Sequence, residues 1–114
     1  MRLAIALLAC LTGACSSADE AASAHSAYYQ CVSSIAHQLG GEGNATPSEA
    51  NAGVSKCDGK LETAARLRAK QRATIPALRG MTEEQAYKDG VEVFRALALC
   101  RLSHEIAIRD CPIA

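Results

Sequence analysis

Apolar and small residues recur at steps of three and four along most of the chain, and the first such stretch predicts a helix over residues 19–39. The positions on its apolar stripe are Ala21, Ala24, Tyr28, Cys31, Ile35 and Leu39. This spacing places one side of an α-helix against a core. Tyr29 lies off the stripe, where an exposed ring can anchor a partner. The glycine-rich segment 40–45 then ends the helix and favours an antiparallel neighbour.

A second helix is predicted over residues 47–73, and its start is marked by a capping box. Thr46 suits the N-cap position, Pro47 the first helical position, and Glu49 lies three residues after the cap. The sequence therefore places the N-terminus of this helix within a residue or two.

Two glycines interrupt the second helix without shifting its apolar stripe. Gly53 and Gly59 flank Cys57, which lies on that stripe. Each glycine costs an α-helix about 1 kcal/mol relative to alanine, so we expect both to mark close approach of a neighbouring helix. A local kink at residues 58–59 is the alternative interpretation.

A third helix is predicted over residues 82–109, after Pro76 has ended the second. Thr82 and Gln85 form its capping box, and Pro112 follows its far end. Its apolar face is wide, and the larger residues on it are Val91, Val93, Phe94, Leu97 and Leu102. No segment alternates apolar and polar residues for long enough to predict a strand.

These elements predict an all-α fold in which residues 19–114 form a single domain, a small disulfide-stapled antiparallel three-helix bundle. The chain has 114 residues, no Trp and one Phe, so its core is thin. Domains of this size often need covalent cross-links to supplement a small core. The cysteines are therefore expected to carry structural weight.

The N-terminal segment has the layout of a secretory signal peptide, with Arg2, an apolar run and then small residues. It is too short to span a bilayer permanently. Residues 11–15 resemble a lipoprotein processing site, which ends the signal at residue 14 and acylates Cys15, although that motif prefers Leu where Thr12 stands. Cleavage after residue 18 is the alternative. Both predict a bacterial protein exported to the periplasm, or to the periplasmic side of the outer membrane as a lipoprotein.

Either cleavage point leaves four cysteines, and an even count in an oxidising compartment predicts two disulfides. Cys31 and Cys57 lie about 12 and 15 Å from the turn between the first two helices, so we expect them to pair. Cys100 and Cys111 then form the second pair, which requires the chain to leave helical geometry between residues 103 and 110. Pairing of Cys100 with Cys57 or Cys31 is the alternative.

No motif in the chain predicts a catalytic residue, a metal site or a cofactor. Cys100 and His104 lie one helical turn apart, a spacing that suits a nucleophile or two metal ligands. In an exported protein, however, Cys100 is better explained as half of a disulfide. We therefore expect a protein that is not an enzyme.

The one charge asymmetry is a basic tract at the end of the second helix and in the connector after it. Its members are Arg66, Arg68, Lys70, Arg72 and Arg79. Cations are favoured in the last turns of a helix, and acidic residues at the start of the next helix balance them, which explains the tract structurally. The other interpretation is a contact for another envelope protein or an anionic envelope component. The formal net charge of zero argues against nucleic-acid binding.

The segments YYQCV (28–32) and LALCRLSHE (97–105) resemble the small periplasmic immunity proteins that block type VI amidase effectors. The resemblance implies an inhibitor of a cell-wall amidase. More generally, the sequence predicts a non-enzymatic envelope protein that serves as a small helical protein-binding or inhibitor module. A structural lipoprotein that tethers the envelope is the other alternative, with Cys15 as its only contact with the membrane.

Overall fold

The computed structural model describes residues 14–74 and 80–111, with side chains from residue 19 onward, and this part of the chain is all-helical apart from its turns. Its helices are α2 (Ala14–Gln38), α3 (Pro47–Ser55), α4 (Asp58–Arg72), α5 (Glu83–Leu102) and α6 (His104–Asp110). The predicted all-α class is confirmed, but the second and third predicted helices are each divided in two. The predicted signal segment lies outside the described residues up to residue 13.

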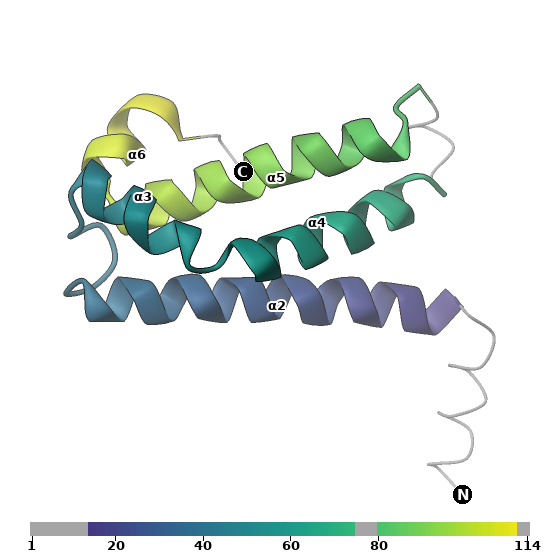
Figure 1. Ribbon diagram of the computed structural model, residues 1–114, viewed down its shortest axis with the longest axis horizontal. Helices are drawn as coiled ribbons and strands as arrows, with labels where there is room; N and C mark the ends of the chain where they lie inside the picture. The colour runs from purple at the N-terminus through teal and green to yellow at the C-terminus, as the bar shows by residue number, and fades with distance from the viewer. Residues whose placement is uncertain (1–13, 75–79, 112–114) are drawn as a thin grey trace, which may run out of the picture.

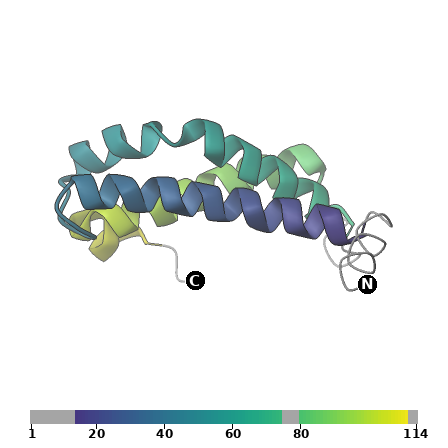
Figure 2. The same ribbon diagram turned by 90° about the horizontal axis from the view of Figure 1, so that it is seen from below.

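The helices lie side by side in the order α2, α4, α5 (Figure 1). α4 packs against both α2 and α5, whereas α2 and α5 share fewer contacts with each other. α3 continues the line of α4 toward the end where α6 folds back over α5 (Figure 1). Figure 2, seen from below, shows α2 in front, running along the same long axis as α4 and α5. No helix within the described ranges is both long enough and apolar enough to cross a membrane.

The predicted helix over 47–73 is interrupted at residues 56–57, which corrects the expectation of one continuous helix. The Lys56 and Cys57 amides donate to the carbonyls of Gly53 and Val54, three residues back, at 3.1 and 3.0 Å. Such short-range bonds tighten the last turn of a helix and end it. α4 then begins at Asp58 with Cys57 as its N-cap residue. The apolar stripe survives the break, which is why the pattern does not reveal it.

The two glycines of this region have different surroundings. A Cβ atom on Gly53 would lie 2.6 Å from Cγ2 of Ile35, so α3 approaches α2 closely there, as expected. The same expectation is wrong for Gly59, where a Cβ atom would meet nothing within 4 Å. Gly59 instead lies in the first turn of α4, directly after the break.

The predicted helix over 82–109 also ends early, at Leu102. Ser103 is extended, with φ −132° and ψ 122°, and forms an isolated bridge with Asn44. The glycine-rich loop pairs with this junction, since the Gly43 amide donates to the Arg101 carbonyl at 2.9 Å and the His104 amide donates to the Gly43 carbonyl at 3.1 Å. Gly43 has φ +81°, and a Cβ there would collide with the His104 ring. The loop is therefore a structural partner of α5 and α6 as well as a turn.

Two disulfides lie within the described residues, and both are expected pairs: helix geometry favoured the first, and the second required the last helix to break. Cys31 bonds to Cys57 with a Cα–Cα distance of 6.0 Å, which joins α2 to the α3–α4 junction. Cys100 bonds to Cys111 with a Cα–Cα distance of 5.6 Å, and the break at Ser103 brings the two together. Disulfides are typical of oxidising, exported locations.

The starts of α3 and α5 follow the local signals in the sequence, since both predicted capping boxes are present, at Thr46 with Glu49 and at Thr82 with Gln85. The apolar face of α5 is narrower than predicted. Phe94 and Leu102 are buried, whereas Val93 and Leu97 are each 37% exposed. Part of the predicted core face of α5 therefore remains on the surface.

Candidate functional site: the α2–α5 groove

α2 separates from α4 and α5 toward its N-terminal end, as Figure 1 shows. Small residues allow α4 and α5 to remain close there: a Cβ on Gly90 would be 3.6 Å from the Cβ of Ala65. The buried residue that α2 contributes to this end is Ala21, which has too short a side chain to fill the space. The result is a hollow between three helices.

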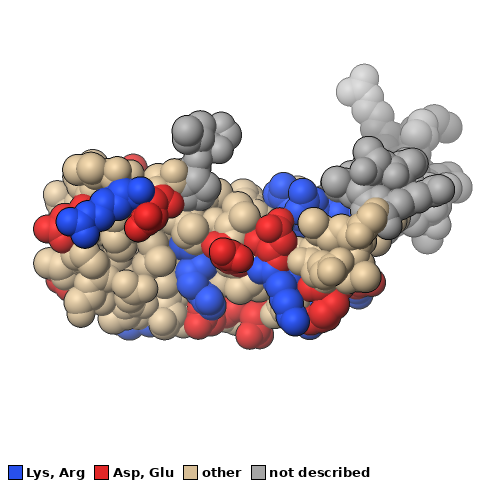
Figure 3. Space-filling view, turned by 90° about the horizontal axis from the view of Figure 1, so that it is seen from above, with Lys and Arg blue, Asp and Glu red and all other residues tan. Residues whose placement is uncertain are grey.

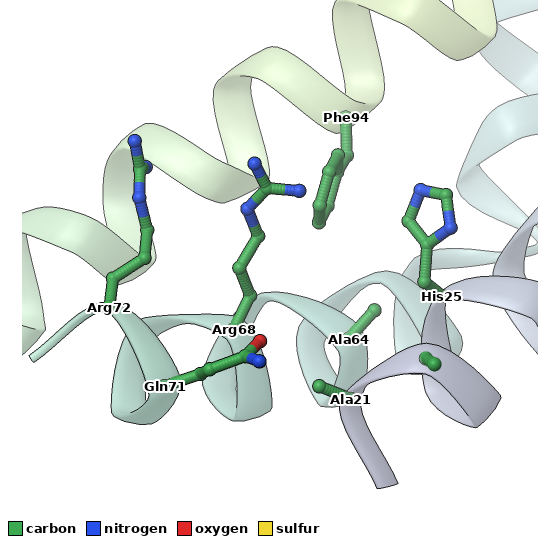
Figure 4. Close-up of a pocket in the computed structure, with 8 residues that line it drawn as sticks. Ala21, His25, Ala64, Arg68, Gln71, Arg72 and Phe94 are labelled. Atoms are coloured by element: carbon green, nitrogen blue, oxygen red, sulfur yellow. The ribbon is translucent and has the colours of Figure 1, made fainter. Parts of the chain in front are cut away.

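This basic hollow has a volume of about 490 Å³ (Figure 4). Its polar and aromatic lining comes from His25 of α2, Arg68, Gln71 and Arg72 of α4, and Phe94 of α5. Figure 4 shows the Phe94 ring between Arg68 and His25. Alanines of α2 and α4 form the remainder of the wall, so the hollow combines an apolar floor with a cationic rim.

A second, aromatic hollow of about 200 Å³ continues from the first between α2 and α5. Its main lining residues are His25, Tyr28, Tyr29, Phe94, Leu97 and Arg101. The two hollows meet at His25 and Phe94, whose ring centroids are 5.2 Å apart. We call the combined surface the α2–α5 groove. Tyr29 is 53% exposed on its rim, so the groove presents aromatic surface to solvent.

Each end of the groove carries an arginine with unused hydrogen-bonding capacity. Arg68 lies 5.2 Å from the Phe94 ring centroid, and among the described residues no carboxylate is within ion-pair distance of it. Arg101 stacks on the Tyr29 ring at 3.8 Å and its Nε donates to Glu42. Its Nη1 is buried and has no hydrogen-bond partner. Arg68 can therefore donate to a carboxylate in the groove, and Arg101 can do so if its guanidinium group turns toward the groove.

Tyr28 forms part of the wall between the groove and the core. The residue is 4% exposed, and its hydroxyl makes no hydrogen bond. Burial raises the pKa of Tyr28 to about 12, with the positive charge of Arg95 acting in the opposite direction. The phenol is thus neutral over the whole physiological range.

The structure separates the members of the predicted basic tract. Arg66 pairs with Glu84 at 2.8 Å and stacks on Tyr87, and Arg72 pairs with Asp89 at 3.4 Å. The hydrogen bond from Arg66 lowers the pKa of Glu84 and raises that of Arg66. Acidic and basic side chains are accordingly interspersed on the face seen from the α5 side (Figure 3).

Of the other members, Arg68 faces the groove, Lys70 is exposed outside its lining, and Arg79 lies outside the described residues. The structural explanation of the tract therefore accounts for Arg66 and Arg72. Only Arg68 combines exposure, an aromatic neighbour and the absence of an ion pair within the described ranges.

The other candidate chemistry has a structural explanation. Cys100 is disulfide-bonded, and the His104 ring packs against the loop at Gly43. In the part of the chain with described side chains, no group of three or more His, Cys, Asp or Glu residues is placed to hold a metal ion. The side chain of Cys15 is outside that part, although its backbone lies in the first turn of α2.

Sequence reasoning missed His25, Leu97 and Arg101 as members of one surface. Leu97 matches a core position in the helical pattern, and His25 matches a solvated one. The available signal was Tyr29, an aromatic residue outside the apolar stripe. No protein-family model, curated protein or solved structure matches the chain, so inferences about its function rest on the groove itself.

Proposed function

We propose that this chain is a non-enzymatic bacterial envelope protein, exported to the periplasm, that binds another protein in the α2–α5 groove. One observation carries the proposal: exposed Tyr29 and Leu97 lie between Arg68 and Arg101, whose guanidinium groups have unused hydrogen-bonding capacity. Tyrosine and arginine next to an apolar pocket are the residue types that dominate binding energy at protein interfaces.

Capture from envelope extract tests this proposal. The disulfide-intact mature protein serves as bait beside Arg68→Glu and Leu97→Glu, which change the groove, and Lys60→Glu, a matched charge reversal on an exposed α4 residue outside the groove lining. Wild type and Lys60→Glu are expected to retain the same partner, and the two groove variants to lose it. Retention of that partner by all four proteins would contradict the proposal.

A specific observation favours the inhibitor form of this function. The two segments that resemble amidase immunity proteins face each other across the aromatic hollow, with Tyr28 and Tyr29 on one side and Leu97 and Arg101 on the other. The assay tests inhibition of an amidase effector encoded beside this chain, with peptidoglycan as the substrate. Stoichiometric inhibition of its peptidoglycan hydrolysis, lost on Leu97→Glu, supports this form, and unchanged hydrolysis removes it.

The manner of export is part of the same proposal. Two disulfides support an oxidising compartment, and a signal peptide ending at residue 14 or 18 delivers the chain there. Acylation at Cys15 is the lipoprotein form, and it is the form that a tethering role requires. The intact mass of the mature protein distinguishes the lipoprotein from the protein without an anchor. An acylated N-terminus at Cys15 supports the anchor, and an N-terminus at Asp19 excludes it.

A further inference from the structure

We infer that the occupant of the α2–α5 groove is an amphipathic helix of the partner, with two carboxylates about two turns apart on either side of an apolar side chain. This inference rests on the proposed function and specifies the chemistry of the partner. It follows from the length of the groove, its apolar middle and the positions of its two arginines.

The dimensions of the groove match a short helix. Its α2 wall extends from Ala21 to Val32, a difference of 32 − 21 = 11 residues. At 1.5 Å per residue this is about 16 Å, or three helical turns. Extended peptides bind by adding to an open sheet edge, and the described residues form only an isolated bridge. An amphipathic helix laid in an apolar groove is the mode that this surface fits.

The middle of the groove is apolar and accessible. Leu97 is 37% exposed and Tyr29 is 53% exposed, on opposite walls of the aromatic hollow, with Phe94 at its inner end. A large apolar side chain inserted here would cover Leu97 and Tyr29 and contact the edge of the buried Phe94 ring. Anionic lipid headgroups or glycans would use the arginines but would leave this apolar surface in water, so charge alone does not account for the groove.

The two arginines set the spacing of the carboxylates. The guanidinium group of Arg68 lies 5.2 Å from the Phe94 ring centroid, and Arg101 is seven residues beyond Phe94 on α5, a rise of about 10 Å at 1.5 Å per residue. Residues i and i+7 of a partner helix span the same rise, about two turns, which is the spacing taken for the two carboxylates. The Nη1 of Arg101 is buried and lacks a hydrogen-bond partner, which is unfavourable, so a carboxylate bound here requires the guanidinium group to turn toward the groove.

A second copy of this chain does not supply that pattern. Its only two acidic residues seven apart are Glu42 and Glu49, and these lie in the loop before α3 and in the first turn of α3. Glu42 already pairs with Arg101, and Glu49 closes a capping box. The groove therefore fits a different polypeptide better than a second copy.

Fluorescence anisotropy with synthetic peptides tests the inference. The probe is a labelled helical peptide of about 14 residues, with Glu at i and i+7 and Leu at i+3 and i+4. The matched peptide has Lys in place of both Glu residues. We expect the Lys peptide to bind at least about tenfold more weakly, because charge pairs across an interface contribute on this scale.

Protein variants locate the interaction. Arg68→Glu is expected to weaken binding of the Glu peptide about tenfold and to restore part of the binding of the Lys peptide, while Lys60→Glu leaves both affinities unchanged. Circular dichroism verifies folding, and Arg68→Gln replaces Arg68→Glu if the reversal unfolds the protein. The Gln variant is then expected to bind the Glu peptide more weakly than the wild type and to prefer it less over the Lys peptide, because only Arg101 still faces a carboxylate.

Three results overturn the inference: equal binding of both peptides, no binding of either, or binding of phosphatidylglycerol vesicles that Arg68→Glu abolishes while neither peptide competes. If envelope capture still depends on the groove in those cases, the proposed function stands and only the partner chemistry is wrong. If the Glu peptide binds as expected but captured partners ignore the groove variants, the proposed function fails instead.

Discussion

The two ends of this molecule are packed differently. The cross-linked end contains α3, α6, both disulfides and the largest fully buried side chains, including Val54, Leu61 and Leu102. The open end contains the C-terminal half of α4 and the N-terminal halves of α2 and α5. Its buried residues are mostly alanines, and ion pairs at Arg66 and Arg72 join α4 to α5.

This difference shows how so small a chain can both fold and keep a binding surface. Covalent bonds and large aliphatic side chains fix the relative positions of the helices at one end. At the other end α2 contributes mainly small side chains to its contact with α4 and α5, and the space left between the three helices is the basic hollow. Apolar surface that the core does not use, such as Leu97, remains available where the two regions meet.

The largest expected effect comes from removing the disulfide that joins α2 to the cross-linked end. Its sequence separation is 26 residues, and closure of such a loop is expected to contribute about 3.5 kcal/mol to the free energy of unfolding. We therefore expect Cys31→Ala with Cys57→Ala to lower that free energy by about this amount, measured by urea denaturation. Cys100→Ala with Cys111→Ala, which opens a loop of separation 11, is the matched control with a smaller loss. Equal stability of all three proteins would contradict the role given to this end.

The next effect concerns Tyr28, where the two ends meet. Its pKa is raised to about 12, so between the ordinary tyrosine pKa near 10 and that value the unfolded chain loses the proton while the folded chain keeps it. This favours unfolding, and stability falls as the pH rises through that window, by at most about 2.7 kcal/mol. We expect Tyr28→Phe to remove this loss without destabilising the protein at neutral pH, because the hydroxyl has no partner. Identical alkaline unfolding curves for the two proteins would show that the phenol is solvated.

Two glycine substitutions compare close packing with open space on either side of the helix break. Gly53→Ala places a methyl group against Ile35 and is expected to lower the free energy of unfolding by about 1 to 3 kcal/mol. Gly59→Ala meets no neighbour and is expected to raise it by up to about 1 kcal/mol through helix propensity. Thermal unfolding measures both. If both substitutions changed the free energy of unfolding in the same direction, the contrast between close packing at Gly53 and open space at Gly59 would be contradicted.

The smallest effect is expected at the exposed ion pair of the open end. Glu84→Gln removes the acceptor for Arg66, and exposed pairs contribute little to stability in salt. Because the pKa of Glu84 is lowered in the folded state, its contribution is present above the ordinary glutamate pKa and is lost as the pH falls through the lowered value. The wild type and variant are therefore expected to differ slightly at neutral pH and to converge in acid. A difference in stability between the two proteins that persists in acid and in high salt would show that Glu84 contributes through packing and not through its ion pair.

Features set by neighbouring residues were predictable from the sequence. The capping boxes at Thr46 and Thr82 depend on contacts within four residues, and the first disulfide follows from the heights of Cys31 and Cys57 on adjacent helices. The break at Ser103 depends on a bridge to Asn44 from a distant part of the chain. Sequence reasoning reached it only as a condition of the second disulfide.

The groove was less predictable, because its members come from three helices. The tract that contains Arg68 is visible in the sequence, but pairing of Arg66 and Arg72 with α5 depends on tertiary structure. Leu97 has the periodicity of a core residue, and its exposure results from the separation of α2 from α5. Periodicity identifies the face of a helix, whereas the neighbouring elements decide whether that face is covered.

Site-specific photo-crosslinking in the organism that makes the protein tests the central claim most directly. A photoreactive residue replaces Leu97 inside the groove or, as the control, Glu62, which is exposed on α4 outside the groove lining. The claim predicts one discrete adduct with another polypeptide from position 97 and none from position 62. No adduct from position 97, or the same adduct from both positions, would contradict it.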